Sequence, residues 1–173
     1  NLVWAEDGKT LFYTKQDPST LRAYQVFRHI LGTEPSKDVL VYEEKDETFS
    51  CGVNRSKSRK FLFVVSRHLQ STEYRVLAAD RPETELKLIQ AREPGHLYSV
   101  EHRGDDFYFR TNWKAKNHRL MKSPVLSPAR ESARAANWLH PDDSLIVTVG
   151  LPARLVIVAS LHSHNRTGVA PPT

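Results

Sequence analysis

Short apolar runs separated by polar turns recur along the first 123 residues of the chain, and their length predicts β-strands. Three segments, 4–13, 53–63 and 100–109, share one order: the end of a strand, a polar turn and a new strand. Phe12 and Leu62 lie 50 positions apart, and Leu62 and Tyr108 lie 46 apart. Four-stranded propeller blades repeat at roughly 40 to 50 residues. The pattern therefore predicts a propeller repeat, with a non-repeating β-sandwich as the alternative.

The predicted fold class is all-β, with about three four-stranded antiparallel blades of a partial β-propeller. In segment 24–30 apolar and polar residues largely alternate, as in a strand with one solvated face. Segment 61–65 is apolar on both faces, which predicts an inner strand packed between neighbouring blades. The expected strands are 2–5, 11–15, 24–31, 39–44, 60–66, 73–79, 86–91, 97–101, 107–111 and 119–122.

The pattern changes from Pro124 onward. Ser127 is a suitable N-cap and Pro128 a suitable first residue for a short helix near 128–136. We expect blades over 1–138 and a divergent segment over 139–173, with strands at 145–149 and 155–159 before a disordered tail.

Composition places the chain among globular proteins, because 39% of its 173 residues are hydrophobic and 26% are charged. Its apolar runs are strand-sized and fall short of the ~18 residues of a membrane span, so no membrane partner is expected. The single cysteine, Cys51, has no internal disulfide partner, which favours a reducing compartment and a cytoplasmic location.

The net charge of +5 raises the hypothesis of a nucleic-acid binder, which would bind DNA or RNA in a salt-sensitive way. The densest basic cluster, Arg55, Lys57, Arg59 and Lys60, alternates with serines in a predicted turn. A solvated hairpin tip explains this cluster better, and we expect no nucleic-acid partner.

Candidate chemistry is sparse. The sequence contains no G-x-S-x-G elbow, glycine-rich phosphate loop or H-E-x-x-H motif, so we assign no catalytic, cofactor-binding or metal residues. His162 and His164 would share one face of a strand, but a metal site needs a third ligand and an exposed pair is the favoured interpretation. Two sequons, at 54–56 and 165–167, are weak patterns.

Four carboxylates cluster after the fourth expected strand: Glu43, Glu44, Asp46 and Glu47. Such a group is compatible with acid–base chemistry. At the end of a strand, however, a solvated rim of acids is the more common arrangement, and we expect that here.

Several blocks resemble the oligopeptidase B branch of the prolyl oligopeptidase family of serine peptidases. They comprise residues 4–13, 18–21, 26–33 and 40–49, and the most specific feature is Tyr-Glu-Glu-Lys-Asp at a fixed distance after His-x-x-Gly-Thr. Residues 109–120 are similar to a loop of the third repeat in that family. The resemblance covers about residues 1–123.

The resemblance implies a seven-bladed propeller above an α/β-hydrolase domain that cleaves short peptides after Arg or Lys with a Ser-Asp-His triad. The chain would lie inside the propeller and lack the triad, so we expect it to be inactive alone. Its expected partners are the catalytic domain and, for the whole enzyme, short basic peptides. Beyond about residue 138 the chain departs from the family pattern. A truncated or frameshifted reading frame would explain this departure.

The implied role is a lid that admits substrates by size and excludes bulk water. Charges among 43–47 are candidates for tuning its closure. The alternative is a non-enzymatic propeller scaffold for protein interaction. In either case an incomplete propeller leaves unpaired edges, so we expect a marginally stable or oligomerising product.

Overall fold

The computed structural model describes residues 1–125, 147–148 and 156–157. The chain divides into two compact units, Asn1–Asn137 and Trp138–Thr173, and each is described by itself. In the second unit β12 (Val147–Thr148) pairs antiparallel with β13 (Val156–Ile157). The helix expected near 128–136, His162, His164 and the sequon at 165–167 lie outside the described residues.

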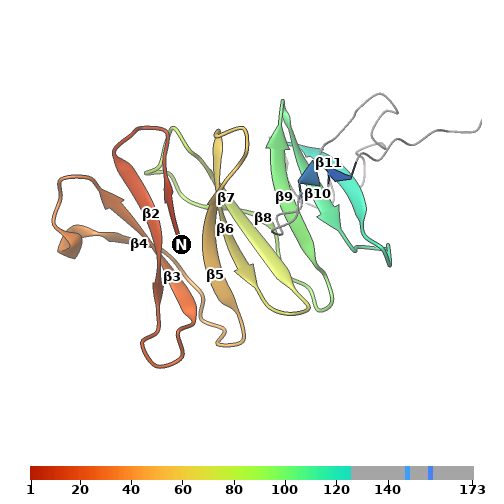
Figure 1. Ribbon diagram of the computed structural model, residues 1–173, viewed down its shortest axis with the longest axis horizontal. Helices are drawn as coiled ribbons and strands as arrows, with labels where there is room; N and C mark the ends of the chain where they lie inside the picture. The colour runs from red at the N-terminus through yellow and green to blue at the C-terminus, as the bar shows by residue number, and fades with distance from the viewer. Residues whose placement is uncertain (126–146, 149–155, 158–173) are drawn as a thin grey trace, which may run out of the picture. The chain divides into compact units, whose positions relative to one another are not determined.

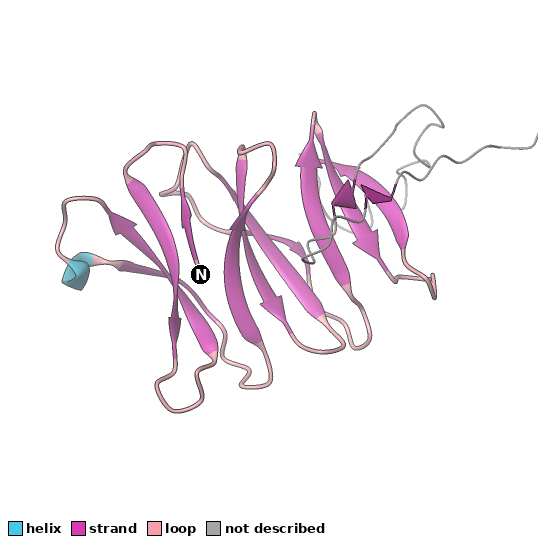
Figure 2. Ribbon diagram, viewed as in Figure 1, coloured by secondary structure: helices cyan, strands magenta, loops and turns pink. Residues whose placement is uncertain are grey.

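The first unit begins with a four-stranded sheet in which each strand pairs with the next (Figure 1). A single 3-10 turn, Pro35–Lys37, precedes its last strand (Figure 2). Asp7 shapes the first turn by accepting hydrogen bonds from the amides of Lys9 and Thr10, while Gly8 takes a φ of 68° that favours glycine. The strands are β1 (Leu2–Trp4), β2 (Thr10–Gln16), β3 (Ala23–Ile30) and β4 (Val39–Glu43).

Two further antiparallel sheets follow in chain order. The second comprises β5 (Ser50–Arg55), β6 (Phe61–Arg67), β7 (Thr72–Ala78) and β8 (Lys87–Gln90). The third comprises β9 (Tyr98–Arg103), β10 (Asp106–Thr111) and β11 (Arg119–Pro124), with β10 in the middle. The expected all-β class is confirmed: the described part of the first unit has two four-stranded sheets and one three-stranded sheet, and the second unit adds the two-stranded pair of β12 and β13.

The core lies between successive sheets, and β6 contributes to it on both faces. Leu62 and Val64 pack with Phe12 and Val26 of the first sheet. The alternate residues Phe63 and Val65 pack with residues of the third sheet, including Phe107 and Phe109. A strand buried on both sides must be apolar at consecutive positions. The prediction made from residues 61–65 is therefore confirmed.

One local prediction was incomplete. Only the end of β5, at Val53, was expected as a strand, because Gly52 and polar residues leave only Cys51 and Val53 as its buried apolar positions. The side chain of Asn112 accepts a hydrogen bond from the Leu97 amide (2.9 Å) and donates one to the Gly95 carbonyl (2.8 Å), so it fixes the neighbouring linker.

Candidate functional site at the blade linkers

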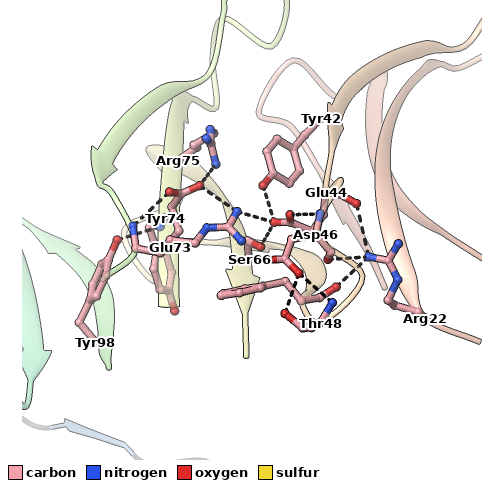
Figure 3. Close-up of polar contacts among 12 residues, drawn as sticks. Arg22, Tyr42, Glu44, Asp46, Thr48, Ser66, Glu73, Tyr74, Arg75 and Tyr98 are labelled. Atoms are coloured by element: carbon pink, nitrogen blue, oxygen red, sulfur yellow. Dashed lines mark hydrogen bonds and ion pairs between the residues drawn. The ribbon is translucent and has the colours of Figure 1, made fainter. Parts of the chain in front are cut away.

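Two linkers carry the chain from the last strand of one sheet to the first strand of the next, at residues 44–49 and 91–97. Because consecutive strands run in opposite directions, both linkers lie at the same end of the sheets as the β2–β3 and β6–β7 loops. A polar cluster joins the two linkers there (Figure 3). We call it the Glu44 cluster, and its members are Tyr42, Glu44, Ser66, Glu73, Arg75 and Arg92.

Glu44, immediately after β4, is the centre of this cluster. Its side chain is only 3% exposed, and one carboxylate oxygen accepts hydrogen bonds from Arg92 Nη2 (2.6 Å), the Tyr42 hydroxyl (2.9 Å) and the Ser66 hydroxyl. The other oxygen accepts one from the Asp46 amide at 2.9 Å. The expected solvated rim is therefore wrong for Glu44. It holds for Glu43, Asp46 and Glu47, which are exposed.

The hydrogen bonds of Glu44 outweigh the cost of burying its charge. Burial alone would raise the pKa of Glu44, but the bonds from Arg92, Ser66, the Asp46 amide and Tyr42 hold that pKa below its usual value. Burial, with the hydrogen bond to Glu44, raises the pKa of Tyr42 to about 12. Glu44 is therefore ionised and Tyr42 neutral at physiological pH.

Arg92, in the second linker, connects Glu44 to the second sheet. Its Nη2 lies 3.5 Å from a carboxylate oxygen of Glu73, and its backbone amide donates to the other oxygen at 3.1 Å. Its guanidinium lies 4.0 Å from the ring centroid of Phe49, a cation–π contact with the first linker. Arg75 pairs with Glu73. Two arginines thus balance two buried acids.

Arg22, in the β2–β3 loop, holds the backbone of the first linker. Its Nη1 donates to the carbonyl oxygens of Phe49 (2.8 Å), Asp46 (3.2 Å) and Glu44 (3.3 Å). Asp46 closes a local turn by accepting bonds from the amide and hydroxyl of Thr48. Arg22 therefore provides a hydrogen-bond donor for three linker carbonyl oxygens that lie outside the β-strands.

The geometry of the Glu44 cluster suits a structural clasp better than acid–base chemistry, because both buried acids are engaged by arginines. Cys51 is also buried, and burial raises the pKa of its thiol to about 11, which leaves it protonated and unreactive. Among the described residues, no group of three or more His, Cys, Asp or Glu side chains is arranged to hold a metal ion. Nor does any helix in this part of the chain have the length and apolar character needed to cross a bilayer.

The basic residues of the β5–β6 turn also make contacts between sheets. Arg55 and Arg59 both bind the Glu6 carboxylate of the first sheet, at 2.8 and 2.9 Å. Lys57 and Lys60 are exposed on the turn. Sequence reasoning placed the turn correctly but did not identify the acid that two of its arginines bind.

Sequence reasoning also missed Ser66, Glu73 and Arg92 as members of the Glu44 cluster. Glu73 and Arg75 alternate along one strand, which is a weak signal that they share a face. Nothing in the sequence pairs Arg92 with an acid 48 positions earlier.

A sequence model described as the prolyl oligopeptidase N-terminal β-propeller domain matches residues 1–165 of the chain. The chain belongs to this family. The matched range includes most of the segment after residue 138 in which the sequence analysis expected a departure from the family pattern.

Curated relatives of this propeller family include dipeptidyl aminopeptidase BI from Pseudoxanthomonas mexicana, which is 38% identical over 148 residues (84% of the chain, 20% of the relative). Protease 2 from Moraxella lacunata is 38% identical over 125 residues (72% of the chain, 18% of the relative). The chain thus spans about a fifth of the length of these relatives.

Solved structures of oligopeptidase B are similar to the chain. The enzyme from Trypanosoma brucei aligns with a TM-score of 0.73 and 29% identity, over 87% of the chain and 21% of the enzyme. The enzyme from Leishmania major aligns with a TM-score of 0.71 and 30% identity, over 77% of the chain and 19% of the enzyme. The three sheets are therefore blades of the family's propeller, and the Glu44 cluster lies where consecutive blades are joined.

Proposed function

We propose that the chain forms part of the propeller lid of an oligopeptidase B-like serine endopeptidase, which cleaves short peptides after Arg or Lys. In this role the chain is non-catalytic and gates access by size. The match of residues 1–165 to the propeller domain carries the proposal. It is supported by the likeness to two structures of oligopeptidase B.

A lid selects by size only if its blades hold their spacing when a large substrate presses on them. The Glu44 cluster meets this requirement, because Glu44 and Arg92 lie in different linkers and bind each other directly. The interleaved core on both faces of β6 adds to the same effect. Exclusion of bulky chains and of bulk water then follows from the shape of the closed lid.

The partner of the lid in this proposal is an α/β-hydrolase domain, which supplies the serine nucleophile, its Asp and His partners and the acids that bind the basic side chain. The proposed compartment is the cytoplasm, in agreement with a single, buried cysteine.

The test uses the longer polypeptide encoded by the reading frame around this chain. Its sequence should contain a G-x-S-x-G elbow followed by Asp and His. It should cleave a short peptide with one arginine much faster than the same sequence placed within a long unfolded protein. A frame without the elbow would refute the peptidase and favour an interaction scaffold. Equal cleavage of the short and long substrates would refute the size gate.

A further inference from the structure

A concave region with a volume of about 1220 Å³ lies along the edge strands β5 and β9, and we call it the edge concavity. Its wall includes Thr48 of the first linker, His68 of the β6–β7 loop and His118 of the β10–β11 loop. These segments all lie at the linker end of the sheets, so part of the edge concavity lies at the same end as the Glu44 cluster.

Two cationic side chains, Arg67 and Arg110, line the edge concavity. His68 and His118 line it as well, and no Asp or Glu is among the described residues of the wall. Arg67 and Arg110 are exposed, and neither forms an ion pair within the described part of the chain. His68 packs against Phe49 of the first linker, with the ring centroids 5.4 Å apart, so the positive charge of the wall rests chiefly on the two arginines.

On one side of the wall His118 lies beside the positive charge of Arg110. Burial, and then the neighbouring Arg110 charge, lower the pKa of His118 below its usual value. His118 also holds a φ of 60°, so the loop keeps it beside Arg110 in a conformation that non-glycine residues rarely adopt. An anion placed beside Arg110 would offset the positive charge on this side of the wall.

The edge strands add main-chain groups that a peptide can bind. An edge strand directs every second N–H and C=O away from its own sheet. The side-chain amide of Asn1 already uses this edge of β5, donating to the Val53 carbonyl at 2.6 Å and accepting from the Val53 amide at 3.2 Å. An extended peptide backbone presents the same pair of groups.

We propose that the edge concavity binds the carboxylate of a short extended peptide. Arg67 and Arg110 hold the carboxylate, and the open edges of β5 and β9 hold the peptide backbone. The carboxylate belongs either to the C-terminus of the peptide or to an acidic side chain. This binding does not depend on the peptidase activity proposed above, because this chain alone carries all of the groups involved.

The experiment measures fluorescence anisotropy of tetra-alanine peptides that carry a neutral fluorophore at the N-terminus, titrated with the full 173-residue chain. Three forms are compared: the free acid, its C-terminal amide, and an amide in which the last alanine is replaced by glutamate. We expect at least one acidic form to bind about tenfold more tightly than the neutral amide, and this advantage to shrink with added salt. The acidic form that binds identifies the source of the carboxylate.

Variants locate the site. Arg67→Gln and Arg110→Gln should each remove most of the advantage of the acidic form and leave binding of the neutral amide unchanged. Arg103→Gln is the matched control, because Arg103 is exposed at the other end of β9 and does not line the edge concavity. All three variants should retain the circular dichroism spectrum of the parent chain. The proposal is overturned if the acidic and neutral forms bind alike, if none binds, or if Arg103→Gln weakens binding as much as Arg110→Gln.

Discussion

A single buried acid, Glu44, organises the junction between the first two blades. It looks like one of several solvated acids in the sequence, yet its carboxylate accepts four hydrogen bonds, one of which is also the ion pair with Arg92. The difference between Glu44 and its neighbours depends on Arg92 and Ser66, which lie far from it in sequence. Contacts of this kind leave no local pattern, so the sequence could not single out Glu44.

Replacing Glu44 by glutamine tests the role of this acid. The amide group of Glu44→Gln cannot pair with Arg92 as an ion, and its N–H donors face the donors that now bind the carboxylate. We expect the free energy of unfolding to fall by about 2 kcal/mol, measured by urea denaturation. Glu47→Gln, at an exposed neighbour, should change it by less than about 0.5 kcal/mol. Equal effects of the two changes would contradict the clasp.

The lowered pKa of Glu44 also predicts a pH dependence. Its contribution to stability is fully present above its unfolded-state value, about 4.5, and is lost as the pH falls through the lower folded-state pKa. The difference in thermal midpoint between the parent chain and Glu44→Gln should therefore be largest at neutral pH and narrow below pH 4.5. A difference that stays constant into acid would show that the charge of Glu44 is not what stabilises the fold.

At the scale of elements, strands with strong apolar patterns were predictable over most of their length, whereas only the end of the weakest strand, β5, was expected. The apolar run at residues 61–65 predicted β6, because burial on both faces of a strand requires consecutive apolar residues. Strand β5 contributes only two buried apolar side chains, so its existence depends on pairing with β6, which the local sequence does not encode.

The central position of β6 predicts a large effect from truncating its side chains. Leu62 is 1% exposed and lies between the first two sheets, so Leu62→Ala should lower the free energy of unfolding by about 3 kcal/mol through lost burial and a residual cavity. Leu88→Ala in β8, where the side chain is 46% exposed, should cost about 1 kcal/mol or less. Similar losses at the two positions, seen by urea denaturation, would argue against β6 as the shared core strand.

At the scale of the whole molecule, one face of the first sheet has no covering sheet among the described residues. Cross-strand pairing aligns Leu2, Tyr13, Phe27 and Leu40 in one row across β1 to β4. Leu2 and Leu40 are 60% and 44% exposed. An apolar row of this kind favours association when nothing else covers it.

We therefore expect the purified chain to associate as its concentration rises, as sedimentation velocity would show. Leu40→Lys places a charge in the exposed row and should shift the chain toward monomer, whereas Leu69→Lys, at an 88% exposed loop position, should not. A parent chain that remains monomeric at all concentrations would contradict this expectation.

The central claim is that the chain supplies propeller blades, and we therefore expect it to have no peptidase activity by itself. The most direct test is hydrolysis of a chromogenic arginyl amide by the purified chain, with parallel labelling by a serine-reactive fluorophosphonate. We predict no hydrolysis above the buffer rate and no labelling. Hydrolysis that follows the chain through purification and is abolished by the fluorophosphonate would contradict the account.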